Sequence, residues 1–88
     1  MTKLLTFNKW SQERIRAGRK FCTSRKKVHL DERVLGIVPL PWWFIREHLY
    51  SIEGADSPNE LQSVINQIFR RKVADDEMFN VHFGDFGG

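Results

Sequence analysis

Residues 15–27 read Ile15-Arg16-Ala17-Gly18-Arg19-Lys20-Phe21-Cys22-Thr23-Ser24-Arg25-Lys26-Lys27. It holds six cations, two hydroxyls and one thiol around a single glycine. Glycine adopts positive φ without a Cβ penalty and is common just past a helix end, so Gly18 is expected to end a short helix. The residues after Gly18 are expected to form a strand or extended loop that presents cationic side chains to an anion.

The residues around this stretch predict strands on both sides of a helix. Residues 4–7 form a short apolar run, and Asn8 is a good N-cap for a helix over 9–17. Residues 20–25 are compatible with a strand, and the apolar run 34–38 has strand length. Pro39 is expected to close that strand, and both strands are expected to join one sheet.

The second half of the chain predicts two helices and a final strand. Pro41 suits the first turn of a helix whose core face holds Trp42, Ile45 and Leu49. Ser57, Pro58 and Glu60 form a capping box, so a second helix begins at Pro58 and ends near Arg71. It carries an apolar stripe, expected to lie on a sheet, of Leu61, Val64, Ile65, Ile68 and Phe69. Residues 79–83 alternate apolar and polar side chains like a half-buried strand, with His82 expected to face solvent or a groove.

Length and composition indicate one domain over residues 1–88. No apolar run is long enough for a membrane span, and the N-terminus is too short and polar for a signal peptide, so we expect a soluble, cytoplasmic protein without a membrane partner. A single cysteine excludes an internal disulfide framework, and Cys22 is expected to be buried rather than reactive. Of three tryptophans, Trp43 is the one expected to be exposed, because a core-facing Trp42 turns its neighbour away.

Charge is distributed unevenly along the chain. Residues 1–33 hold ten Lys/Arg against three Asp/Glu, and the remainder holds four against eight, giving +7 and −4. This asymmetry predicts a positive patch at residues 14–27 and a phosphate-bearing partner. The alternative is a solvated basic face that serves only solubility.

Three blocks carry a resemblance to a known family: residues 15–20 with Thr23 and Arg25, Glu53-Gly54 ahead of residues 57–61, and Val81-His82-Phe83. Together they make the chain resemble the ASCH domains, which have a PUA-like fold, a small β-barrel flanked by helices. The resemblance covers most of the chain and implies an α+β fold with about three helices and an RNA- or nucleoside-related role. One group of these proteins is similar to an amidohydrolase that deacetylates N4-acetylcytidine with Lys, Thr and Glu. The matching positions here are Lys20, Thr23 and Glu53.

One position and one segment depart from the family pattern. Phe21 stands where the family usually has Thr, and residues 26–33 are short for the family's extra strands. The expectation is therefore a truncated barrel. Either a dimer partner completes the sheet, or the pocket is shallower, which favours binding over turnover.

The implied chemistry makes a geometric demand. Thr23 would be the nucleophile and Lys20 its base, while Glu53, which favours the charged amine, would orient Lys20, relay a proton or protonate the leaving amine. In a regular strand Lys20 shares a face with Cys22 and Ser24, not with Thr23. Cooperation of Lys20 with Thr23 therefore predicts an irregular backbone near residues 18–21.

The residues support three functional hypotheses. The first is an RNA-binding or nucleoside-binding domain with a basic cleft, whose phosphate contacts come from Arg19, Lys20, Arg25, Lys26 and Lys27. The second is an amidohydrolase that uses Lys20, Thr23 and Glu53. The third is an interaction module that forms a homodimer through a sheet edge. No motif implies a cofactor, and the three histidines show no zinc-ligand spacing with Cys22.

Overall fold

Three strands and four helices make up the computed structural model, which describes residues 5–86. In chain order they are α1 (Lys9–Arg16), β1 (Cys22–Arg25), β2 (Val34–Pro41), α2 (Trp42–His48), α3 (Tyr50–Glu53), α4 (Pro58–Phe69) and β3 (Met78–Gly84). The expected α+β class is confirmed, and within the described residues the strands form an open sheet.

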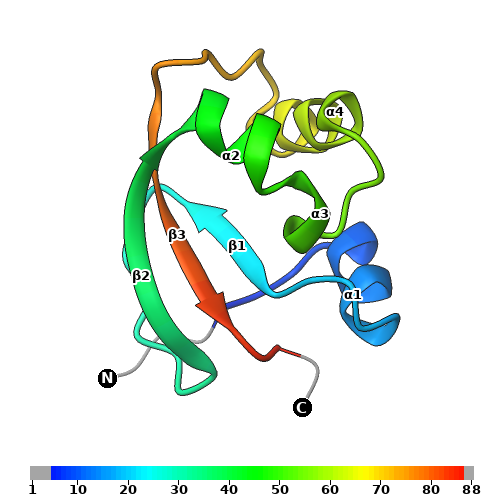
Figure 1. Cartoon of the computed structure of the whole chain (residues 1–88), viewed down its shortest axis with the longest axis vertical. Coiled ribbons are helices and arrows are strands. Elements are labelled where there is room, and N and C mark those ends of the chain that lie inside the picture. Colours follow the sequence, from blue (N-terminus) through cyan, green and yellow to red (C-terminus); the bar gives the residue numbers. More distant parts are fainter. Residues whose placement is uncertain (1–4, 87–88) are drawn as a thin grey trace.

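The sheet is antiparallel with the order β1-β3-β2, so the last strand of the chain lies between the other two. His82 in β3 is opposite Thr23 on one side and Ile37 on the other. The helices gather along one side of the curved sheet (Figure 1). Because β3 lies between them, β1 and β2 are the two edge strands of the sheet.

The core lies between the sheet and the helices. Its innermost side chains include Trp42 and Ile45 of α2 and Phe79 and Val81 of β3. Cys22 is also fully buried, as expected, and this burial raises the pKa of its thiol. Trp42 is fully buried while Trp43 is 44% exposed, so the prediction for this pair is confirmed.

The first predicted strand is not present at residues 5–7, and Leu4 lies outside the described residues. Side-chain hydrogen bonds take the place of a strand ladder here. The Leu5 amide donates to Asp31 Oδ2 at 2.9 Å, and Arg33 Nη2 donates to the Leu5 carbonyl at 3.1 Å. The apolar run gave no indication that the side chains of Asp31 and Arg33 would take up the hydrogen bonds of the Leu5 amide and carbonyl.

The prediction that Pro39 closes the second strand is wrong, because β2 continues to Pro41. Proline lacks the amide that a central strand needs on both sides, but an edge strand tolerates it where the amide would face outward. β2 is such an edge strand. Pro39 and Pro41 therefore leave two fewer outward amides with which another strand could pair.

The predicted helix starts at residues 9 and 58 are confirmed, whereas Pro41 is the extended N-cap residue before α2 and does not lie in its first turn. Asn8 Oδ1 accepts the Ser11 amide at 2.8 Å, and Ser57 Oγ accepts the Glu60 amide at 3.1 Å. α4 ends two residues before the predicted Arg71, and its C-cap Arg70 has φ of 56°. None of the helices in residues 5–86 is long and apolar enough to cross a membrane.

Candidate functional site

A cleft of about 380 Å³ lies between β1 with the loops flanking it and α4. One wall is polar and basic and comes from residues 20–27. The other wall is the apolar face of α4, including Val64, Ile68 and Phe69. Trp10 of α1 also lines the cleft.

The backbone before β1 is irregular, as the cooperation of Lys20 with Thr23 requires. Gly18 has φ of 70°, and the strand begins only at Cys22. The Phe21 amide donates to the Ile52 carbonyl at 2.7 Å, which ties this segment to α3, while the Phe21 carbonyl accepts the Gly84 amide at the end of β3 at 3.0 Å. Lys20 is thereby placed beside the end of α3.

Lys20, Glu53 and Ser24 form a buried hydrogen-bonded network. Lys20 Nζ donates to Glu53 Oε1 at 2.9 Å and to the Glu53 carbonyl at 3.0 Å. Ser24 Oγ donates to Glu53 Oε2 at 2.5 Å. The Lys20 and Glu53 side chains are only 3% and 4% exposed, although all three residues line the cleft.

Close packing under this network depends on Gly54, which follows α3. Gly54 has φ of 103°, and a Cβ there would come within 2.8 Å of Arg14 Cβ. A left-handed residue without a side chain therefore lets α1 approach the end of α3.

Thr23 has a different partner from the one its proposed role requires. Its Oγ1 accepts a hydrogen bond from Arg25 Nε at 3.3 Å, and no hydrogen bond in the described part of the chain joins it to Lys20. Ser24, which the resemblance did not single out, contacts Glu53 instead. Strand parity, which places Ser24 on the same face as Lys20, was the signal that could have identified it.

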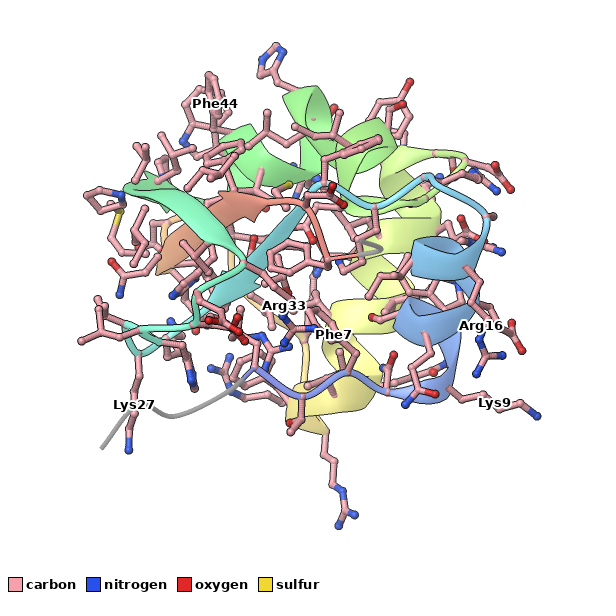
Figure 2. The ribbon with its side chains drawn as sticks, turned by 90° about the horizontal axis from the view of Figure 1, so that it is seen from below. Phe7, Lys9, Arg16, Lys27, Arg33 and Phe44 are labelled. Atoms are coloured by element: carbon pink, nitrogen blue, oxygen red, sulfur yellow. The ribbon has the colours of Figure 1, made fainter. Side chains whose placement is uncertain are left out.

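The five predicted phosphate-binding residues are in different environments. Lys20, Arg25, Lys26 and Lys27 line the cleft, whereas Arg19 is not among its lining residues and pairs with Asp56. Lys26 Nζ lies 3.1 Å from Glu77 Oε1. Figure 2 shows the Lys27 side chain extending away from the body of the protein.

The expectation that His82 faces solvent or a groove is wrong, because its side chain is fully buried. Nε2 accepts the His29 amide at 2.9 Å, and Nδ1 lies 2.9 Å from the Asn80 carbonyl, to which it donates. Burial, and to a smaller extent the positive charge of Arg25, lowers the pKa of His82, while hydrogen bonds to the Asn80 and Thr23 backbone oppose this. His82 is therefore a neutral, structural acceptor for the loop after β1.

Among residues 5–86, no three His, Cys, Asp or Glu side chains are arranged to hold a metal ion. No family model, no curated protein and no solved structure matches this chain. The site must therefore be interpreted from its own chemistry.

Proposed function

We propose that this protein is an ASCH-type domain of the PUA-like class that binds RNA by seating one nucleoside in the cleft. The observation that carries the proposal is the buried Lys20–Glu53–Ser24 network on the wall of a cleft with an apolar opposite side. In this proposal the open sheet corresponds to part of a PUA-like barrel. The basic residues of the cleft attract the RNA backbone.

The hydrogen-bonding capacity of Lys20 supports this function. An ammonium group has three donors, and two of those on Lys20 are used by Glu53. The third is left for a ligand acceptor such as the carbonyl oxygen of a base. Because Glu53 also accepts from Ser24, it holds the ammonium in one position.

The shape of the cleft supports the same conclusion. A volume of about 380 Å³ falls in the range of about 300–1,000 Å³ usual for small-molecule sites. The flat face of a base can pack on apolar or aromatic side chains, and the cleft offers the α4 wall and Trp10. The centre of the Trp10 ring lies 6.0 Å from Lys20 Nζ, so an aromatic surface and a hydrogen-bond donor are close together.

Binding is tested with a fluorescently labelled single-stranded oligoribonucleotide, by anisotropy at several salt concentrations. We expect affinity to fall steeply with salt, and Ile68→Asp to abolish binding because it places a carboxylate at the cleft. Ile68 is 53% exposed, so its replacement leaves the core intact. Leu35→Asp, at a residue 85% exposed outside the cleft, is the matched control. Equal binding by both variants would refute the proposal.

A second candidate is the amidohydrolase, favoured because Lys20, Thr23 and Glu53 line one cleft. Thr23 Oγ would attack the acetyl carbonyl, the cytidine amine would leave with a proton, and water would then release acetate from the threonine ester. Lys20 must first give up a proton and turn from Glu53 toward Thr23. The binding function needs no such rearrangement and is therefore preferred.

Turnover is tested by incubating N4-acetylcytidine with the protein and following cytidine by chromatography. The threonine mechanism requires that the wild type releases cytidine and that Thr23→Ala releases none. Ser63→Ala, at an exposed position of α4, is the folded control and should release cytidine like the wild type. Absence of release by the wild type, or release that survives Thr23→Ala, excludes the threonine mechanism.

A further inference from the structure

The cations of the cleft differ in whether a carboxylate neutralises them. Lys20 is paired with Glu53 and Lys26 with Glu77. Arg25 and Lys27 take part in none of the ion pairs formed among residues 5–86. Two positive charges at the cleft are thus available to an anion.

Arg25 is the more informative of the two because it is partly buried. Burial lowers the pKa of Arg25, while Glu53 opposes this. Among the described residues no hydrogen bond or ion pair joins Arg25 to Glu53, whose carboxylate oxygens are bonded to Lys20 and Ser24. A guanidinium taken out of water without a carboxylate is unfavourable unless another anion compensates it.

The contacts that Arg25 does make are with neutral groups. Nη2 donates to the Thr6 carbonyl at 2.5 Å, Nε donates to Thr23 Oγ1, and the guanidinium lies 5.3 Å from the centre of the Phe7 ring. These contacts hold the side chain in place. A guanidinium has five N–H donors in a planar fork, so further donors remain for a bidentate contact with phosphate oxygens.

We propose that the natural ligand of the cleft carries a phosphate group, which Arg25 binds with Lys27 at the mouth, so that the unit recognised is a nucleotide and not a bare nucleoside. This inference rests on the proposed function and specifies its ligand. Arg19 and Lys26, despite their place in the same basic stretch, are expected to contribute less, because Arg19 lies outside the cleft and pairs with Asp56, and Lys26 pairs with Glu77, which it shares with Arg71.

Isothermal titration calorimetry at low salt tests this with the four ribonucleosides, their 5′-monophosphates and inorganic phosphate. At least one monophosphate should bind about tenfold or more tightly than its nucleoside, as one charge-assisted contact allows. Arg25→Gln should abolish this difference. Arg19→Gln, which removes the same charge from the same stretch by the same substitution, should preserve it.

Arg25 also anchors the segment around Thr6, so thermal unfolding of each variant is recorded alongside binding. Arg25→Lys serves as a second variant because it keeps the charge while losing the fork, and it should retain part of the difference between nucleotide and nucleoside. A purely structural Arg25 would change melting temperature without changing the ratio of nucleotide to nucleoside affinity.

The outcomes separate the two proposals. Equal affinity for nucleosides and nucleotides overturns the phosphate inference and leaves nucleoside binding in place. Inorganic phosphate that binds as tightly as every nucleotide overturns the seating of a base in the cleft. No binding of any nucleoside, nucleotide or oligoribonucleotide overturns both.

Discussion

Lys20 and Glu53 lie side by side with almost no solvent contact, so the loss of one leaves the other as an unpaired buried charge. We expect Lys20→Met to lower the free energy of unfolding by about 3–5 kcal/mol. Urea denaturation followed by circular dichroism measures this. The double variant Lys20→Met/Glu53→Gln should recover much of the loss, and a double variant no more stable than the single one would contradict this explanation.

His82 should make stability depend on pH on the acidic side. Its pKa is lowered in the folded protein, so the unfolded chain takes up a proton first as the pH falls. The free energy of unfolding should be unaffected by His82 above the ordinary pKa of about 6.5 and should decrease below it, by at most about 1.4 kcal/mol per pH unit.

The measurement is thermal unfolding between pH 7.5 and 5. His82→Gln should flatten the change relative to the wild type. A wild-type slope that persists in His82→Gln would assign the effect to another group.

Individual side chains were predictable where sequence neighbours decide their environment. Cys22 and the Trp42–Trp43 pair belong to this class, because strand composition and helix periodicity fix which side chain points inward. Ser24 is different. Its partner Glu53 lies 29 residues away in sequence, on a short helix that no local pattern indicated.

Among the elements, α4 has an unfavourable residue at its C-cap. Arg70 has φ of 56°, a left-handed conformation that strains a residue with a Cβ. Arg70→Gly should relieve this strain and raise the free energy of unfolding by about 0.5–1 kcal/mol, after the greater flexibility of glycine in the unfolded chain is deducted. Urea denaturation tests it, with Arg71→Gly as the neighbouring control, which should not stabilise.

Helix starts were predictable because a cap acts over three residues, as Asn8 and Ser57 illustrate. The end of β2 was not, since tolerance of Pro39 depends on an edge position that is set by where β3 inserts. The absence of a strand at residues 5–7 has the same origin. Asp31 and Arg33, which are distant in sequence, bond the Leu5 backbone.

For the whole molecule, the edge of β2 bears on assembly. Because Pro39 and Pro41 offer no amide to a neighbouring strand, we expect dimerisation through this edge to be disfavoured. Sedimentation equilibrium over a wide concentration range measures the mass. A dimer that dissociates on substitution of Leu35 or Val38 by Asp, both exposed on β2, would instead support the sheet-edge interaction module.

The α+β class could be predicted from the order of expected elements, but the openness of the sheet could not. Whether strands close into a barrel depends on the length and path of every connection. The length of residues 26–33 indicated only that this segment is too short for the extra strands of the family. The positive patch was only partly predictable from charge, because Asp56 and Glu77 come from the acidic second half and form ion pairs with Arg19 and Lys26.

The accessibility of the Cys22 thiol can be used to measure how often the cleft region opens. The thiol is fully buried and its pKa is raised, so a thiol reagent can modify it only when β1 separates from the core. Where reclosing is faster than modification, the labelling rate measures the population of that open form. Because Cys22 lies between Lys20 and Ser24 in sequence, a ligand that holds the cleft together should slow labelling, so the native cysteine can report binding without an engineered label.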